Sequence, residues 1–151
     1  MDAMTSDTTL DLTLTMTRVF AAPPARVWKA WTDKDQVAAW FGPAGVTSDI
    51  DTWDFRVGGA YHLVMRETDD DYPLRGTFLE IVEGERLAMT WTWEHGVLDG
   101  VEMVVEVDFR AVDGGTEVTL THTRLPSETA QEKHGEGWTG CFDCLADHLG
   151  G

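Results

Sequence analysis

AAPPARVWKAWTDKDQVAAWFGP, residues 21–43, is the stretch of the sequence that decides the fold. It gathers four large aromatic side chains between a pair of prolines and a closing Gly-Pro: Trp28, Trp31, Trp40 and Phe41. Pro24 suits the first turn of a helix, where the N–H that proline lacks would have no partner in any case. Aromatic side chains at this density belong either to a core or to the wall of a binding site.

The spacing within this stretch predicts two short helices. Trp28 and Trp31 share one face of the first helix, and we expect them to anchor it on the rest of the fold. Thr32 is predicted to cap the second helix, with Asp33 in its first turn, where the helix dipole favours an anion. Gly42 with Pro43 ends the second helix. Trp40 and Phe41 therefore lie near the mouth of any cavity that the fold encloses.

The flanking sequence predicts strands. Residues 10–17 alternate between apolar and polar side chains, which is typical of a half-buried strand. Residues 46–124 contain six further alternating runs that are separated by glycine-rich turns. The turn at residues 113–115 is of the hairpin type that requires positive φ. We expect these six strands to be antiparallel.

The final segment predicts a long helix that begins after Ser127 as its N-cap. At 100° per residue, its apolar side chains fall within about 60° of one another: Trp138, Phe142, Leu145 and Leu149. Gly135 and Gly137 weaken its early part. A meander of this length must curve, and one helix covers only part of it. The space between sheet and helix is either a cavity or is filled by side chains such as Trp91 and Trp93.

The composition excludes several classes of function. The chain carries 27 acidic and 11 basic residues, for a formal net charge of −16. A surface of this sign repels phosphate backbones and anionic headgroups, so we expect neither a nucleic-acid nor a membrane partner. No secretory signal is evident, and two cysteines make no disulfide framework, so we expect a cytoplasmic protein. We expect residues 1–9 to form a disordered lead and residues 10–151 a single domain.

A series of short motifs follows the chain in a fixed order. They are Phe20 with Ala22-Pro23, VWKAWT (27–32), WFGP (40–43), DFRVGG (54–59), GTFLEI (76–81), WTW (91–93), GTEV (115–118) and Gly137-Trp138. In this combination the chain, over about residues 12–149, resembles the heat-shock protein 90 ATPase-activator-like family. That family is part of the START-like superfamily, also called SRPBCC or Bet v 1-like. Phe41 stands where the family often has a second tryptophan.

The resemblance implies an α+β helix-grip fold, in which a curved antiparallel sheet wraps around a long C-terminal helix and leaves a cavity between them. Relatives bind lipids or other apolar molecules, act as cyclases or hydrolases, or regulate the chaperone. The eukaryotic chaperone regulators carry a separate N-terminal domain with no counterpart in this sequence, so we expect ligand binding before chaperone regulation. We predict no cofactor, and the sequence does not indicate an oligomeric state.

Inward-facing positions of the predicted strands and helices supply the candidate ligand-binding residues. These are Trp40, Phe41, Tyr61, Met65, Phe78, Met89, Trp91, Met103, Val105, His122, His134, Trp138 and Phe142.

Two interpretations remain open for the polar candidates. His122 and His134 either line the cavity as polar anchors or proton-transfer groups, or are hydrogen-bonded histidines of the core or the rim. Glu80 shares the strand parity of Phe78, so it points inward with a raised pKa unless a bulge or strand twist takes it to the rim, or unless it pairs with Arg75 or Arg56. The sequence holds no signature of a catalytic nucleophile, so a binding protein is favoured over an enzyme.

Cys141, Cys144 and His148 share one face of the predicted final helix and are the strongest candidate metal ligands. Zinc would need a fourth ligand and usually a paired motif. The alternative is that Cys141 is a small hydrophobic residue beside the apolar stripe, and on this basis we predict no metal site.

Overall fold

The computed structural model describes residues 11–42, 45–67 and 70–150. Its elements are β2 (Leu12–Phe20), α1 (Pro24–Thr32), α2 (Lys34–Trp40), β3 (Thr47–Trp53), β4 (Ala60–Arg66), β5 (Asp71–Val82), β6 (Arg86–Trp93), β7 (Glu102–Val112), β8 (Gly115–Leu125) and α3 (Glu128–His148). This order confirms the predicted strand, two short helices, six strands and long helix. The lead expected at residues 1–9 lies outside the described residues.

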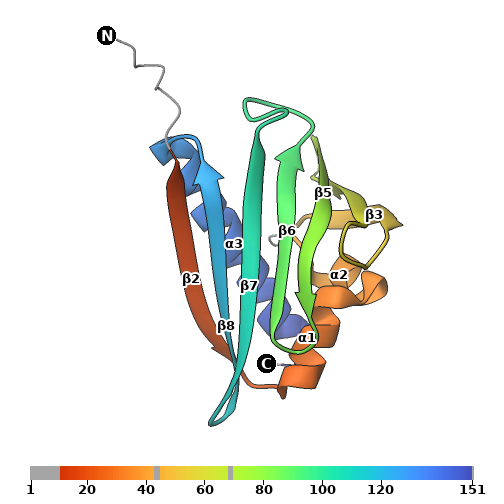
Figure 1. Cartoon of the computed structure of the whole chain (residues 1–151), viewed down its shortest axis with the longest axis vertical. Coiled ribbons are helices and arrows are strands. Elements are labelled where there is room, and N and C mark those ends of the chain that lie inside the picture. Colours follow the sequence, from red (N-terminus) through yellow and green to blue (C-terminus); the bar gives the residue numbers. More distant parts are fainter. Residues whose placement is uncertain (1–10, 43–44, 68–69, 151) are drawn as a thin grey trace.

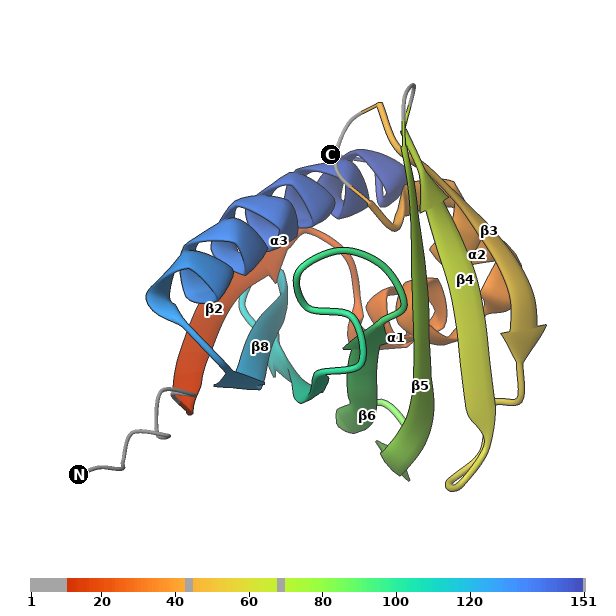
Figure 2. The same ribbon diagram turned by 90° about the horizontal axis from the view of Figure 1, so that it is seen from above.

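One antiparallel sheet holds all seven strands, in the order β2-β8-β7-β6-β5-β4-β3. The two edge strands, β2 and β3, are consecutive in sequence, so α1 and α2 bridge the chain from one edge of the sheet to the other (Figure 1). The sheet curves, and α3 crosses its concave side (Figure 2). The helix-grip fold that the sequence predicted is therefore confirmed.

The helix ends follow the local sequence, with one correction. α1 begins at Pro24, and the Ser127 side chain accepts a hydrogen bond from Ala130 N (3.0 Å) at the start of α3, both as predicted. The N-cap of α2 is Asp33 and not Thr32: Asp33 Oδ1 accepts from Asp35 N at 2.9 Å. Thr32 is still part of α1, whereas a capping residue needs extended backbone, as Asp33 has.

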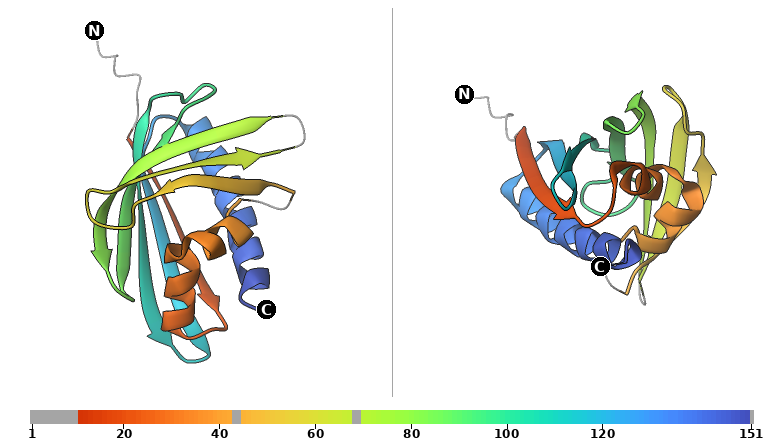
Figure 3. Two further views of the ribbon diagram at one scale, coloured as in Figure 1. Left: turned by 90° about the vertical axis from the view of Figure 1, so that its right-hand side faces the viewer. Right: turned by 90° about the horizontal axis from the view of Figure 1, so that it is seen from below.

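An aromatic cluster around Trp31 fills the closed end of the fold, where α1 and α2 pack beside α3 (Figure 3). The Trp31 indole lies 4.8 Å from Trp40, 6.2 Å from Phe109 and 6.3 Å from both Trp138 and Phe142, measured between ring centroids. One side chain thus joins α1 to α2, β7 and α3. The predicted anchoring role of Trp31 is confirmed.

Gly76 is required by a close approach between two strands and a ring. Tyr61 reaches across β5 to donate a hydrogen bond from its hydroxyl to the Thr90 carbonyl at 2.6 Å. A Cβ on Gly76 would overlap both the Thr90 carbonyl oxygen and the Tyr61 ring. Burial of Tyr61 raises the pKa of its phenol, so the ring is held there in its neutral form. Only glycine leaves room for this crossing.

We expect Gly76→Ala to lower the free energy of unfolding by about 3 kcal/mol, because overpacking a rigid site forces backbone or ring to move. Gly135→Ala is the matched control, since its Cβ would make only an ordinary contact with Leu14 at 3.6 Å. On a helix this control should gain about 0.5–1 kcal/mol. Urea denaturation of both variants measures the difference. Equal stabilities would contradict the packing described for Gly76.

Candidate functional site

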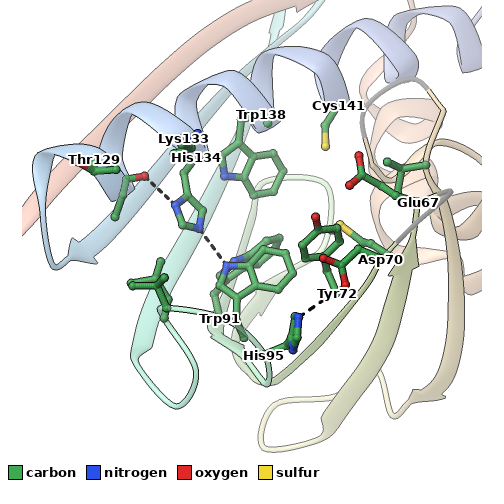
Figure 4. Close-up of a pocket in the computed structure, with 18 of the residues that line it drawn as sticks. Glu67, Asp70, Tyr72, Trp91, His95, Thr129, Lys133, His134, Trp138 and Cys141 are labelled. Carbon is green, nitrogen blue, oxygen red and sulfur yellow. Dashed lines mark hydrogen bonds and ion pairs between the residues drawn. The ribbon is translucent and has the colours of Figure 1, made fainter.

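A pocket of about 740 Å³ lies between the sheet and α3 (Figure 4). Its sheet side is formed by the ends of β4, β5 and β6, and its helix side by residues 127–141. Residues 95–98, in the loop that joins β6 to β7, form a third side of the pocket, and this loop lies between α3 and β5 (Figure 2). Gly96 and Gly100 in this loop adopt positive φ values of 84° and 80°, which glycine tolerates without strain.

The inner wall of the pocket is aromatic. Trp91 and Trp93 come from β6, and His134 and Trp138 come from α3, where a spacing of four residues places them on one face. The Trp91 and Trp138 rings lie 5.1 Å apart, and the Trp91 and Trp93 rings 5.6 Å. The sheet and the helix therefore meet through indole contacts at the base of the pocket.

Both ring nitrogens of His134 are engaged by the protein. His134 Nδ1 donates to the Ala130 carbonyl at 2.8 Å, and Nε2 accepts from Trp93 Nε1 at 3.0 Å. This pairing requires the neutral imidazole, and burial lowers the pKa of His134 accordingly. The residue is a hydrogen-bonded part of the wall.

His122 lies behind the wall and is fully buried on β8. Its Nδ1 accepts a hydrogen bond from Trp138 Nε1 at 3.1 Å, and its ring lies 4.7 Å from His134. Burial, helped by the neighbouring His134, lowers the pKa of His122 to about 3. Both histidines are therefore neutral near pH 7, and neither offers a charge to the pocket.

Among the described residues that line the pocket, the charged groups stand at its mouth. Glu67, Asp70, His95 and Lys133 are all exposed there (Figure 4). His95 Nε2 lies 3.6 Å from an Asp70 carboxylate oxygen. A hydrogen bond to Glu67 raises the pKa of Tyr72 at the same rim. The site thus has an apolar interior and a polar entrance, the common arrangement of small-molecule sites.

The structure divides the thirteen candidate ligand-binding residues into two groups. Met65, Trp91, His134 and Trp138 lie in the pocket wall. The other nine are buried in the core and do not line the pocket: Trp40, Phe41, Tyr61, Phe78, Met89, Met103, Val105, His122 and Phe142. Phe41 and Phe142 contact the Trp138 ring from the core side, at 5.9 and 6.4 Å.

Glu80 does not point into the interior. A bulge in the pairing of β5 with β6, between Phe78 and Glu80, breaks the alternation that strand parity assumes. Glu80 is exposed and accepts a hydrogen bond from Arg86 Nε at 2.7 Å. The bulge that would take Glu80 to the rim is therefore confirmed, and the alternative of pairing with Arg75 or Arg56 is wrong, because the partner is Arg86.

The cysteines of α3 behave as packing residues. Cys141 is buried, and burial raises the pKa of its thiol to about 12, so a thiolate ligand or nucleophile is disfavoured there. His148 Nε2 lies 3.2 Å from Gln36 Oε1. Over residues 11–42, 45–67 and 70–150, no three His, Cys, Asp or Glu side chains come together in a way that could hold a metal ion.

Sequence reasoning missed most of the pocket mouth and one side of its wall. Trp93, Tyr72, Lys133, Gly137 and the 95–98 loop line the pocket but were not among the candidates. Trp93 and Gly137 carried a signal: the first continues the inward parity of Trp91, and the second is a helix glycine near Trp138. The loop carried none, because its place over the concave face depends on how β6 and β7 end.

Comparisons with known proteins agree with this architecture. Residues 21–150 match the protein family described as Activator of Hsp90 ATPase homolog 1-like protein. A crystal structure from Chromobacterium violaceum is 26% identical, with a TM-score of 0.83 over 91% of this chain and 97% of that one. The AHSA1 protein of Silicibacter pomeroyi is 27% identical, with a TM-score of 0.82 over the same shares. A comparison with curated proteins gives no match. Within the described part of the chain, no helix has the length and apolar character to cross a membrane.

The buried His122 makes the stability of the protein depend on pH. Its folded-state pKa is depressed, so below about pH 6.5 the unfolded chain takes up a proton that the folded protein does not. The contribution of His122 to stability is therefore fully present above this pH and is lost as the pH falls toward the folded-state pKa. Between pH 7 and pH 5 this one group should cost about 2 kcal/mol.

His122→Gln keeps an acceptor for Trp138 and removes the titration, so its free energy of unfolding should fall less between these pH values than that of the wild type. Urea denaturation at pH 7 and pH 5 measures the loss. His95→Gln, on the exposed loop, changes a histidine outside the buried pair and should retain the wild-type loss. An unchanged pH dependence in His122→Gln would show that His122 is not buried as a neutral ring.

Proposed function

The chain belongs to the family of Activator of Hsp90 ATPase homolog 1-like proteins, and we propose that it binds a small, largely apolar molecule in the pocket between the sheet and α3. Members of this family commonly bind ligands or partners. The observation that carries the proposal is the pocket itself, with an aromatic wall, charges confined to its mouth and room for a molecule well above the size of a benzene ring.

Gly137 supports this use of the pocket. It lies in the interior of α3 and lines the pocket, and a Cβ built on it meets no other atom within 4 Å. Glycine inside a helix costs about 1 kcal/mol relative to alanine, and no neighbouring side chain requires that cost here. A ligand that approaches the helix backbone closely would explain why glycine stands at this position.

A binding role fits the inner wall better than an acid–base role. His134 has both nitrogens engaged within the protein, and His122 lies behind the wall as a neutral ring. Glu80, the carboxylate considered as an acid or base, lies on the outer surface. The three groups considered for catalysis therefore face away from the pocket or are already occupied, whereas the apolar wall favours burial of apolar ligand surface by about 25 cal/mol per Å².

We expect Gly137→Leu to weaken binding of the neutral hydrophobic dye Nile red by roughly tenfold or more, because the added side chain occupies the space that the dye needs. The variant should fold normally, since leucine is a strong helix former and nothing described lies within 4 Å of the new Cβ. Fluorescence titration measures the affinity, and thermal melting checks the fold.

Gly135→Ala is the matched control on the same helix, two residues away and outside the pocket lining. It should bind the dye as the wild type does. Native mass spectrometry of the purified wild type would then show whether a small molecule from the host occupies the site. If the wild type does not bind the dye and carries no small molecule, the proposed function is wrong.

A partner-binding role is a second candidate, favoured by the family description and by one exposed apolar pair. Val57 and Leu79 are 61% and 45% exposed, and a hydrogen bond from Gly58 N to Phe78 O (2.8 Å) brings their segments together. If this pair contacts a chaperone of the Hsp90 type, the protein should stimulate that chaperone's ATPase, and Leu79→Ser should abolish the stimulation. No stimulation by the wild type in a steady-state assay would reject this role.

A further inference from the structure

Two buried hydrogen-bond donors, one in the pocket wall and one behind it, have no partner. Trp91 Nε1 and His122 Nε2 are buried and make no hydrogen bond to any described residue. Trp91 lines the pocket, and the His122 ring lies 5.7 Å from the Trp91 ring. Trp31 Nε1 is also unpaired, but Trp31 belongs to the aromatic cluster at the closed end and does not line the pocket.

Both of these unpaired atoms, Trp91 Nε1 and His122 Nε2, carry hydrogen. An indole nitrogen can only donate. His122 is a neutral ring whose Nδ1 accepts from Trp138 Nε1, so its proton is on Nε2. A buried donor without a partner is unfavourable. Among the described residues, these two donors therefore have no free acceptor.

The acceptors that the same cluster does contain are already used. His122 Nδ1 is taken by Trp138, His134 Nε2 by Trp93 and the Ala130 carbonyl by His134. An amine or hydroxyl group that entered as a donor would find these three atoms occupied. Trp91 Nε1, by contrast, is a buried donor on a pocket-lining side chain, and no described residue accepts its hydrogen.

The charges around the pocket further narrow the chemical class of the ligand. Lys133, a cation that lines the pocket, is exposed at its mouth, as are the carboxylates of Glu67 and Asp70. Both histidines of the inner cluster are neutral in their hydrogen-bonding pattern. A carboxylate at the inner wall would be desolvated without a counter-charge, which is strongly unfavourable.

We propose that the ligand is an uncharged, largely apolar molecule that carries a carbonyl or ether oxygen, and that this oxygen accepts a hydrogen bond from Trp91 Nε1. This inference rests on the proposed function and assigns the chemical class of the ligand. It also gives Trp91 a role in specificity, in addition to its packing against Trp138.

Four naphthalene probes of nearly equal size test the proposal by competition against Nile red: 2-acetylnaphthalene, 2-ethylnaphthalene, 2-naphthoate and 2-naphthylmethylamine. Hydrophobicity alone favours the ethyl compound over the ketone. One hydrogen bond to the ketone should reverse this order, so that 2-acetylnaphthalene binds about fivefold more tightly than 2-ethylnaphthalene. The anion and the cation should bind more weakly than both.

Trp91→Phe removes the donor and keeps an aromatic ring, and it should bring the ratio of ketone to hydrocarbon affinity to about one or below. Trp93→Phe is the matched control, because Trp93 Nε1 is already donated to His134. It changes the same wall and should retain the wild-type ratio. Since each ratio is taken within one protein, a general loss of affinity in either variant does not affect the comparison.

The outcomes separate the two proposals. If neither Nile red nor any naphthalene binds the wild type, the proposed function fails, and this inference fails with it. If 2-ethylnaphthalene binds at least as well as the ketone, the pocket stands and the inference is overturned. Tightest binding of 2-naphthoate or of the amine would overturn the uncharged class. A ketone preference that survives in Trp91→Phe would overturn the assignment of Trp91.

Discussion

The packing of Trp31 against the indole of Trp138 and the ring of Phe142 is the contact on which the rest of the structure depends. Through it α1 and α2 hold α3 against the sheet at one end. The two short helices carry the chain from one edge of the sheet to the other. The aromatic cluster around Trp31 fills the end of the fold that they close. The N-terminal part of α3 is separated from β4 and β5, and the pocket lies between them. Filled core and pocket meet at Trp138, which belongs to both.

Hydrogen bonding makes the pocket wall rigid as well as apolar. Trp93, His134 and the Ala130 carbonyl form one chain of bonds, and Trp138 with His122 forms a second. Each links α3 to itself or to a strand, so the rings cannot rotate without leaving a buried polar atom unpaired. A preformed wall of this kind favours binding, because little side-chain freedom remains to be lost when a ligand enters.

Charged side chains are concentrated on the outer surface, in contrast to the apolar pocket wall. The many carboxylates of the chain lie outside, and several are paired there: Arg86 alone contacts Glu80, Glu106 and Asp108 within 3.2 Å. In the described part of the pocket lining, the charged groups lie at the mouth. The fold itself is shared by proteins of many functions, so the chemistry of this particular chain has to be argued from its wall, in which donors outnumber acceptors.

Local sequence determined the elements of this protein. Strand alternation, the proline at the start of α1, the Ser127 cap and the aromatic residues of 21–43 each depend on neighbours in the chain, and each was predictable. The N-cap of α2 is equally local, although it lies at Asp33 and not at Thr32, because α1 runs one residue further. Two features depended on contacts between distant segments. The bulge that turns Glu80 outward arises from how β5 pairs with β6. The division of inward side chains into core and pocket wall depends on where α3 leaves the sheet. The alternation of residues along a strand shows which face a side chain is on, but it does not give the distance from that face to α3.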